Sequence, residues 1–483
     1  METPLRRTTH HLHVTTSATA TGMGKRLAGS GGSELWMPSS TPWDASSTAS
    51  GSVQQQLVLP SASAAAVATE MVRAQCVLAL RAKFRTMCEL PAPPLNALER
   101  WLLLNKWYEP QSDEPLLPMG KAATPADAVL SADLRRAGME AETAEALVKK
   151  LRRTARKMAA ALRTSDHRGT CSPCVLQTAA SSGVMRLSCA PPAEGSGASC
   201  DAEALGGDSA TSVLVTTACI DKLRALHARA WPASAEDDDD VMRRVYCCLL
   251  RYQCVGGLGF QAAIGAPVFR CLQARFGCNF EAFASPLNCF YGAFCSAFSD
   301  VDGPFGSRGS FGDFTPTSGA YQCNPPFVVA IIDAMSEHLL TLLTAAEGAC
   351  RSLSFVVVLP GWTDCAGYNR LLNAAPLLRR TLLVAAADHG FVDGGQHARP
   401  RTHRESPYDT MVFVLQSSAA AATWPASDAA IAELEAAFAS CTPSETELAS
   451  VDSTERVHRH GAVRKRKRRK MKRAGKKTRG EWS

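Results

Sequence analysis

Apolar and polar residues alternate with helical spacing between residues 62 and 165. Apolar side chains three and four positions apart form one face of a helix, so the pattern predicts a helical domain over 62–165. Prolines at 91, 93 and 94 separate the first two helices, because proline lacks the backbone N–H that a helix interior needs. The four predicted helices span residues 64–87, 95–108, 125–137 and 140–162.

The fourth predicted helix is strongly basic. Its apolar stripe contains Leu147, Val148 and Leu151, and its outer face is predicted to carry the cations. A solvated helix face explains these cations most simply, and a contact with an RNA backbone is the alternative. The cations are Lys149, Lys150, Arg152, Arg153, Arg156 and Lys157.

The pattern changes after residue 265, where short apolar runs alternate with helical ones. This alternation predicts an α/β fold: a doubly wound, Rossmann-like sheet preceded by the helical domain. Ligands of such sheets bind beyond the carboxyl ends of the strands. Strands are predicted at 280–284, 320–323, 354–359, 381–386 and 410–415, and helices at 241–252, 269–276, 289–298 and 328–343.

Composition divides the rest of the chain. Residues 1–60 are rich in Ser, Thr, Gly and Ala without periodicity, so disorder is expected there. Residues 166–235 are predicted to be a connector with a short strand at 184–189. The predicted parts are therefore a disordered segment (1–60), a helical domain (62–165), a connector (166–235), an α/β domain (236–441) and a disordered basic tail (442–483).

The net charge of +7 is concentrated near the end of the chain. Twelve Lys and Arg residues lie between positions 464 and 479, and without residues 464–483 the chain has 40 basic and 44 acidic residues. Attraction to nucleic acid therefore has to come from the tail or from a local patch. The run from Arg464 to Arg473 is typical of a nuclear localisation signal, so a location in the nucleus is expected.

The 18 cysteines are expected to be reduced thiols, because many lie inside apolar runs and the chain does not open with a secretory signal. No apolar run approaches the about 20 residues of a membrane span, so no membrane contact is expected. Cys171, Cys174, His167 and Cys189 have only a loose zinc-ligand spacing without a second close pair. No metal site is predicted.

The most informative motif is Asn324-Pro325-Pro326-Phe327. Its two prolines stiffen a turn directly after a predicted strand. The Asn324 amide oxygen and the Pro325 carbonyl can accept the two hydrogens of an exocyclic amine, and Phe327 offers a flat face on which a base can stack. An ordinary proline turn is the alternative, because a short motif is confirmed only by its structural context.

Further runs accompany this motif in a specific order. They are FEAFASPLNC at 280–289, FSDVDGPFGSRG at 298–309, Asp333-Ala334-Met335, LSFVVVLPGW at 353–362, Gly395-Gln396-His397, residues 410–416 and Trp424-Pro425. In order and spacing, residues 256–440 resemble the catalytic domain of the phosphorylated-CTD-interacting factor family. Members of this family are cap-specific adenosine N6-methyltransferases with an Asn-Pro-Pro-Phe signature.

The resemblance implies an S-adenosylmethionine-dependent mRNA N6-methyltransferase that acts on the 2'-O-methyladenosine beside the cap, with its methyltransferase domain at 236–441. Capped mRNA would be the substrate, and the C-terminal domain of RNA polymerase II a partner. The relatives are expected to carry a WW module near the N-terminus, with two tryptophans much farther apart than Trp36 and Trp43, which are seven positions apart. The module is therefore predicted to be missing, which puts recruitment to the polymerase in doubt.

The resemblance also assigns the loop after the first predicted strand to the cofactor. Ala284, Ser285, Pro286 and Asn288 would line S-adenosylmethionine. Ser285 and Asn288 can hydrogen-bond its methionine end, and the backbone N–H groups of the following segment favour a carboxylate.

Four more residues are candidates for binding. Asp300 follows where a ribose-binding acid belongs, with Asp302 or an ordinary turn as alternatives. Ser307 and Arg308 lie in a glycine-punctuated loop, where Arg308 would bind the cofactor carboxylate or an RNA phosphate. Trp362 is expected either to stack on the substrate or to pack in the core.

Three other interpretations compete. Residues 257–262 fit a GxGxxA pattern, but they follow a predicted helix and not a strand, which disfavours a dinucleotide site. The substrate alternative is an adenine in internal RNA or in DNA. A catalytically inactive RNA-binding subunit is the third, and the intact motifs argue against it.

Overall fold

The computed structural model describes residues 63–109, 112–164, 175–178, 184–189, 212–232, 237–257, 259–394 and 403–441. The predictions for residues 1–60 and 442–483 lie outside these ranges, including the nuclear localisation signal. The same holds for His167, Cys171, Cys174 and the run Gly395-Gln396-His397.

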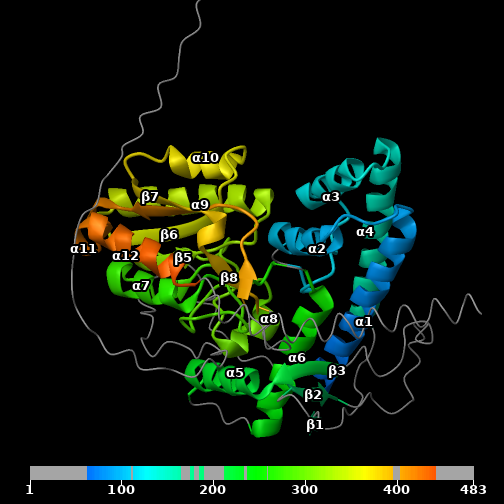
Figure 1. Cartoon of the computed structure of the whole chain (residues 1–483). Helices are drawn as coiled ribbons and strands as arrows, with labels where there is room; N and C mark the ends of the chain where they lie inside the picture. The colour runs from blue at the N-terminus through cyan, green and yellow to red at the C-terminus, as the bar shows by residue number, and fades with distance from the viewer. Residues whose placement is uncertain are drawn as a thin grey trace, which may run out of the picture. The chain divides into compact units, whose positions relative to one another are not determined.

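All four helices predicted in the first part of the chain are confirmed. They are α1 (Ala64–Cys88), α2 (Ala97–Tyr108), α3 (Pro125–Arg136) and α4 (Ala141–Thr164). The Ser63 hydroxyl accepts the N–H of Ala66 at the start of α1 (3.2 Å), which caps that helix. Pro125 opens α3, and Asp127 in its first turn accepts the N–H of Thr124 (3.1 Å). Figure 1 shows these helices in blue to cyan.

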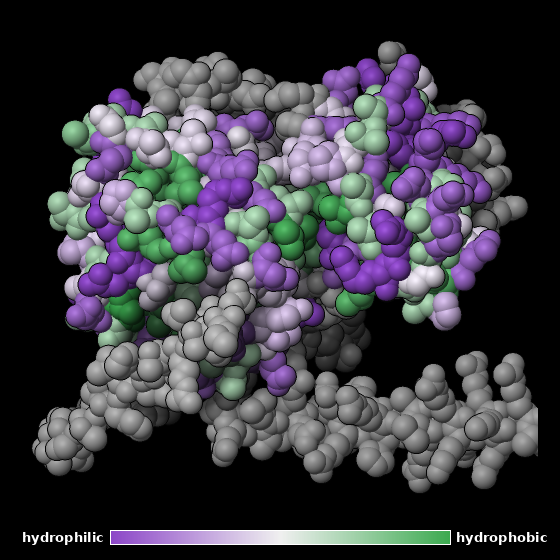
Figure 2. Space-filling view, turned by 90° about the horizontal axis from the view of Figure 1, so that it is seen from above, coloured by the Kyte–Doolittle hydropathy of each residue, from purple (hydrophilic) through white to green (hydrophobic). Residues whose placement is uncertain are grey.

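One cation of α4 points inward. Arg152 was predicted on the outer face, but it is buried and donates to Asp127 (2.7 Å) and Glu109 (2.9 Å). That prediction is wrong because the acceptors come from α3 and from the end of α2, which the pattern of α4 alone cannot reveal. The surface on the side of α3 and α4 is mostly hydrophilic (Figure 2). The exposed cations of α4 include Lys149, Lys150, Arg153 and Lys157.

The predicted connector contains regular structure. Its described strands form a small antiparallel sheet in the order β1-β2-β3. The strand predicted at 184–189 is confirmed as β2, and Asp237 caps α6 by accepting the N–H of Asp240 (2.8 Å). The elements are β1 (Val175–Thr178), β2 (Val184–Ser188), β3 (Ser212–Thr216), α5 (Thr217–Ala230) and α6 (Asp238–Val255).

The larger sheet has mixed strand directions. Its named strands are β4 (Phe280–Glu281), β5 (Gly319–Cys323), β6 (Leu353–Pro360), β7 (Leu378–Val384) and β10 (Thr410–Gln416). Their spatial order is β4-β5-β6-β10-β7. The first three are parallel, and β10 is antiparallel to both of its neighbours. The predicted α/β class and the five predicted strands are confirmed, although β4 is shorter than expected.

Two single bridges extend this sheet beyond β4. Phe294 pairs in parallel with Glu281, and Ser307 pairs in parallel with Phe294. The helix predicted at 289–298 is therefore wrong. The N–H groups of Phe290 and Tyr291 donate to the Glu281 carboxyl (2.7 and 2.9 Å), so they do not form the bonds to carbonyls four residues earlier that a helix needs.

Alternating side chains along β6 explain why helices cover both faces of the sheet. Phe355, Val357 and Leu359 lie in the cluster with α9 (Val329–Gly348) and α10 (Ala366–Leu372). Val356 and Val358 lie in the cluster with α7 (Ala266–Phe276) and α12 (Asp428–Ala439). Figure 1 shows the two helix pairs on opposite sides of the sheet. The remaining elements are α8 (Ser299–Asp302), β8 (Gly390–Val392), β9 (His403–Glu405), α11 (Ser418–Thr423) and 3₁₀ turns at Gly303–Phe305 and Ala386–Asp388.

Within the described ranges, α9 is the one helix long and apolar enough to cross a membrane by length and composition. An apolar run of this length was not predicted from the sequence. In the fold, Ile332, Met335 and Leu339 of α9 are buried against the sheet, and Glu337 pairs with Arg370 of α10 (2.9 Å). Its apolar side is therefore used in the core.

Candidate functional site

The order in which the chain adds strands to the sheet reverses between β4 and β5. After β4 it moves outward to Phe294 and then Ser307, and after β5 it continues to β6 on the other side. Ligands of α/β sheets bind outside the carboxyl ends of the strands at such a reversal. The loop 282–288 follows β4, and the Asn-Pro-Pro-Phe motif follows β5. The fold therefore brings both predicted site segments to this place.

Asn324 occupies the first position after β5. Its Nδ2 donates to the Ala262 carbonyl (3.0 Å), which sets the orientation of the amide. Its Oδ1 is buried and has no hydrogen-bond partner among the residues that the structure describes. A buried acceptor without a donor costs about 1–3 kcal/mol. The atom therefore suits a ligand that brings an N–H or O–H group.

The two prolines set the path of the chain between β5 and α9. Pro325 is buried, and the Pro326 carbonyl accepts the N–H of Val328 (2.7 Å) just before α9 begins. The ordinary role of a proline turn is therefore present. It does not explain the unpaired oxygen of Asn324, which such a turn does not require.

Aromatic side chains gather beside the motif. The ring centroids of Phe327 and Trp362 are 6.2 Å apart at 69°, and Phe327 meets Phe391 edge-on at 5.9 Å. Phe327 and Trp362 are both partly buried, so each contributes to the core and keeps some open surface. Tyr408 meets Trp362 edge-on at 5.4 Å and is 45% exposed. Tyr408 was not predicted as a site residue, because it lies in a loop without a motif.

The predicted cofactor loop is held by its own side chains. The N–H of Ser285 donates to Asn288 Oδ1 (2.7 Å), and the Ser285 hydroxyl lies 2.9 Å from the same oxygen. Ala284 donates its N–H to the Cys295 carbonyl (2.9 Å), and Pro286 is buried. These residues shape the loop, and their direct contact with a cofactor stays a prediction.

Gln261 and Ala262 join the two predicted segments, and neither was predicted as a site residue. The Gln261 carbonyl accepts from Asn288 Nδ2 (3.0 Å), whereas the Ala262 carbonyl accepts from Asn324 Nδ2 (3.0 Å). Both belong to the GxGxxA run at 257–262, which was considered only as a dinucleotide motif. The run follows helix α6, as expected, and serves as the bridge between the loops after β4 and β5.

Asp300 and Asp302 have different surroundings. Asp302 is fully buried, accepts the Tyr252 hydroxyl (2.7 Å), and burial raises the pKa of its carboxyl to about 7. Asp300 has a side chain that is 40% exposed and receives two hydrogen bonds from Arg251 (2.7 and 3.1 Å). Of the two, Asp300 is the one that a ligand can reach.

Ser307 and Arg308 lie at the outer edge of the extended sheet. Ser307 is buried, with its hydroxyl 2.7 Å from that of Ser296. Arg308 is exposed, and its backbone N–H donates to the Phe294 carbonyl (2.8 Å). The segment of Phe294 and strand β4 both lie between Ser307 and β5, so Ser307 and Arg308 are farther from the strand reversal than Ser285 is.

Two buried charged residues support the loop after β4, and neither was predicted. Lys222 of α5 is fully buried and donates from Nζ to the Leu287 carbonyl (3.1 Å). Glu281 holds the chain at Phe290 and Tyr291 through a single oxygen, Oε2. Burial raises the pKa of Glu281 to about 7.

Glu281→Gln should make the melting temperature less dependent on pH. Between pH 4.5, the ordinary pKa of a Glu carboxyl, and about pH 7, Glu281 is protonated in the folded protein but ionised in the unfolded chain. Stability therefore falls as the pH rises through this window. Thermal melts between about pH 5 and pH 8 check this, and a slope unchanged by the substitution would show that Glu281 is ionised when folded. Burial also raises the pKa of Asp302, so part of the pH dependence of the melting temperature should remain in Glu281→Gln.

No group of three or more His, Cys, Asp or Glu side chains suited to a metal ion occurs in the described ranges. The cysteines at 247, 248, 289, 295 and 323 are free thiols, whereas Cys189 is disulfide-bonded, so the expectation of reduced thiols is wrong for Cys189.

Similarity to known proteins covers part of the chain. The family described as "Phosphorylated CTD interacting factor 1 WW domain" matches residues 222–394. A protein of Mus musculus named "mRNA (2'-O-methyladenosine-N(6)-)-methyltransferase" is 38% identical over 205 residues, which cover 40% of this chain and 28% of that protein. The protein of the same name from Homo sapiens is 38% identical over 205 residues, covering 40% of this chain and 29% of its own length.

The prediction that the WW module is missing is wrong, because the matching family is described by that domain. The prediction rested on Trp36 and Trp43, whereas the match lies between 222 and 394, where the chain forms the parallel strands and their helices. The spacing of tryptophans near the N-terminus carries no information about these residues. The chain spans less than a third of the length of these curated relatives. Over that part, it is similar to mRNA (2'-O-methyladenosine-N6-)-methyltransferases.

Proposed function

We propose that this chain is an S-adenosylmethionine-dependent mRNA methyltransferase that modifies N6 of the 2'-O-methyladenosine beside the cap. The observation that carries the proposal is the buried, unpartnered Oδ1 of Asn324 at the carboxyl end of β5. An exocyclic adenine amine supplies the missing donor. The names of the similar proteins support the cap-adjacent adenosine as the target.

The strand order supports a doubly wound, Rossmann-like sheet. With the two bridges included, the parallel order is Ser307, Phe294, β4, β5 and β6, so the chain winds outward in both directions from the centre. The reversal lies between β4 and β5, which is where a Rossmann-like enzyme binds its ligands.

Asn324 would act on the nitrogen that accepts the methyl group. The lone pair of an adenine amine is delocalised into the ring, so the nitrogen has to become tetrahedral before it can react. Asn324 Oδ1 and the Pro325 carbonyl would each accept one N–H and favour that form. The hydrogen bond from Asn324 Nδ2 to the Ala262 carbonyl prevents the Asn324 amide from flipping, so Oδ1 keeps its orientation. Fixed acceptors of this kind act through alignment and electrostatics, so no strong base is required.

The residues present also fit the cofactor. S-adenosylmethionine would supply the methyl group as an electrophilic sulfonium carbon. Asp300 has an exposed carboxylate that can accept the hydroxyls of a ribose, and the loop 284–288 would line the methionine end. Phe327 would hold the target base flat by stacking, with Trp362 beside it.

Methylation of matched oligonucleotides tests the proposal. RNAs that begin with 2'-O-methyladenosine, with and without a 7-methylguanosine cap, are compared with an internal-adenosine RNA and a DNA of the same sequence. The capped RNA is expected to give N6-methyladenosine with the highest kcat/KM. Equal rates on internal RNA or DNA would support the alternative substrates. Failure to bind S-adenosylmethionine in calorimetric titration would support an inactive RNA-binding subunit.

The proposal also includes recruitment of the enzyme to RNA polymerase II and its location in the nucleus. Similarity to a family described by a WW domain supports an interaction with the phosphorylated C-terminal domain of RNA polymerase II. The basic run from Arg464 to Arg473 supports a nuclear enzyme.

Deleting residues 464–483 should abolish nuclear enrichment of a fluorescent fusion and leave activity on a short capped oligonucleotide largely intact. The rest of the chain has 40 basic and 44 acidic residues, and it contains the whole proposed site. The tail should add little electrostatic attraction to the RNA at physiological salt, where exposed charges act over a Debye length of about 8 Å. A truncated protein that stays nuclear but loses activity would identify the tail as a substrate-binding arm.

A further inference from the structure

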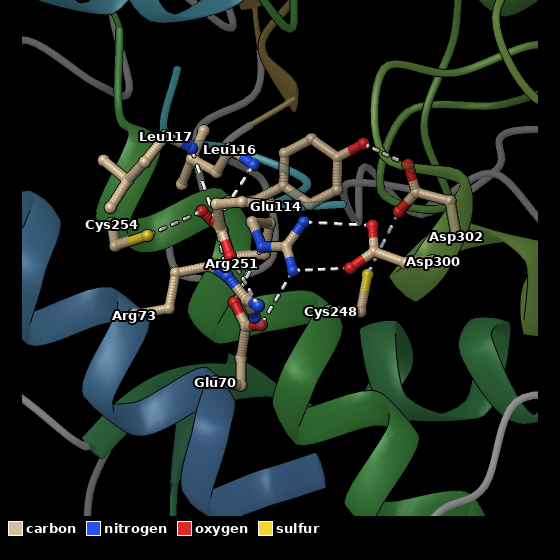
Figure 3. A network of polar contacts seen from close by, with 11 residues as sticks. Glu70, Arg73, Glu114, Leu116, Leu117, Cys248, Arg251, Cys254, Asp300 and Asp302 are labelled. Carbon is tan, nitrogen blue, oxygen red and sulfur yellow. Dashed lines mark hydrogen bonds and ion pairs between the residues drawn. The ribbon is translucent and has the colours of Figure 1, made fainter. Parts of the chain in front are cut away.

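Buried ion pairs connect helix α1 to helix α8 (Figure 3). Arg251 of α6 is fully buried, and its Nε and Nη2 donate to the two oxygens of Glu70 in α1, both at 2.7 Å. The same guanidinium donates to Asp300 of α8, from Nη1 to Oδ1 at 3.1 Å and from Nη2 to Oδ2 at 2.7 Å. One planar group therefore holds two carboxylates from segments far apart in the sequence.

A second set of pairs lies behind Glu70. Arg73 contacts Glu70 and donates to both oxygens of Glu114, at 2.8 and 3.1 Å. Within the described part of the chain, the hydrogen bonds of Glu114 involve Arg73, Leu116 and Leu117 but not Arg251. Glu114 therefore belongs to the same buried cluster but lies one step farther from Asp300.

Asp300 is the most exposed member of this network. Its side chain is 40% exposed, whereas that of Glu70 is 2% exposed. A carboxylate has about four lone-pair positions, and Arg251 uses two of them. Burial alone would raise the pKa of Asp300, but the charge and hydrogen bonds of Arg251 hold that pKa below its ordinary value. Asp300 thus remains an ionised acceptor with an open side, which suits the two hydroxyls of a ribose.

Attachment of α8 does not explain the contact between Arg251 and Asp300. Asp302, two residues farther along, already fastens α8 to α6 through the Tyr252 hydroxyl (2.7 Å). Asp302 is fully buried, as expected of an anchor. Asp300 instead presents its carboxylate at the surface, and the guanidinium of Arg251 fixes the angle at which it does so.

We propose that Glu70 and Arg251 are positioning residues for the cofactor. Glu70 sets the plane of the Arg251 guanidinium, and Arg251 sets the orientation of Asp300, which binds the ribose of S-adenosylmethionine. The inference rests on the proposed function. It gives α1, and with it the helical part of the chain, an indirect role in cofactor affinity through Arg251 and Asp300. The effect survives high salt, because buried pairs are screened much less than exposed ones.

Calorimetric titration of S-adenosylmethionine into Glu70→Gln and Glu114→Gln tests the inference. Each substitution removes one buried carboxylate of the cluster, so both should lower the melting temperature. Only Glu70→Gln should weaken cofactor binding, by about tenfold. Its KM for the cofactor should rise by a similar factor, with kcat and the KM for RNA nearly unchanged. Equal weakening in both variants, or none in Glu70→Gln, would overturn the inference.

A double-mutant cycle shows whether Glu70 acts through Asp300. Asp300→Asn should itself weaken cofactor binding, and adding Glu70→Gln should then have little further effect, because coupled residues are not additive. Full additivity would contradict a path through Asp300. If Glu70→Gln does not fold, Glu70→Asp retains the charge with a shorter reach and should show a smaller loss of affinity. A wild-type chain that binds no S-adenosylmethionine would refute the proposed function itself.

Discussion

Asn324→Ala should abolish methyl transfer while S-adenosylmethionine affinity stays nearly unchanged. The substitution removes Asn324 Oδ1, one of the two acceptors that we assign to the amine, and leaves only the Pro325 carbonyl to hold it. Loss of one such transition-state hydrogen bond lowers kcat on the order of 100-fold or more. The expected signature is therefore a fall in kcat, measured at saturating cofactor and RNA, with cofactor affinity followed by calorimetry.

The free energy of unfolding distinguishes a catalytic role of Asn324 from a structural role. Asn324→Ala removes a buried acceptor without a partner and one hydrogen bond to Ala262, so the free energy of unfolding should change by only about 1 kcal/mol. Asn324→Asp is the matched control. It keeps an acceptor for the amine but loses the Nδ2 donor to Ala262, so its activity should fall between those of wild type and Asn324→Ala. Wild-type turnover in purified Asn324→Ala would refute the assignment of the motif.

Phe327→Ala should raise the KM for RNA and also slow the reaction. Stacking of a base on an aromatic ring contributes about 1–3 kcal/mol, which corresponds to a loss of roughly 5- to 150-fold. Phe327→Tyr and Phe327→Trp should keep substantial activity, because each retains a flat aromatic face. Steady-state kinetics on the capped oligonucleotide measure the effect.

The core contacts of Phe327 require their own control. Phe391 is buried, meets Phe327 edge-on at 5.9 Å and belongs to the hydrophobic cluster against which Phe327 packs. Phe391→Ala should therefore lower the melting temperature with little change in the KM for RNA. If Phe327→Ala has the same pattern, with lower stability and an unchanged KM, then Phe327 serves the core and not the substrate.

Local patterns predicted most of the fold. The helices α1 to α4 were found with boundaries close to the observed ones, because their apolar spacing and caps lie within each segment. The strand β6 and the turn at Asn324 were found for the same reason. The segment 289–298 was mistaken for a helix, because its closely spaced aromatic residues suit either structure. The segment is not helical because the Glu281 carboxyl accepts the N–H groups of Phe290 and Tyr291.

The candidate site was predicted where it carries a motif and missed where it does not. Asn324, Phe327 and Ser285 stand in short runs whose chemistry is visible in the sequence. Gln261 was passed over, because its backbone carbonyl and its side-chain oxygen meet Asn288 and Ser285 only in the folded chain. Tyr408 was passed over because nothing near it in the sequence distinguishes it from other exposed aromatics.

Most of the helices and strands, and the chemistry offered at the end of β5, could be predicted from the sequence. Which charged residues meet depends on the tertiary fold. Arg152 turns inward to Asp127, and Arg251 lies between Glu70 and Asp300, 181 and 49 positions away. The physical reason is that periodicity and capping depend on neighbours within a few residues, whereas a buried ion pair depends on which helices pack together. No window of the sequence contains both partners.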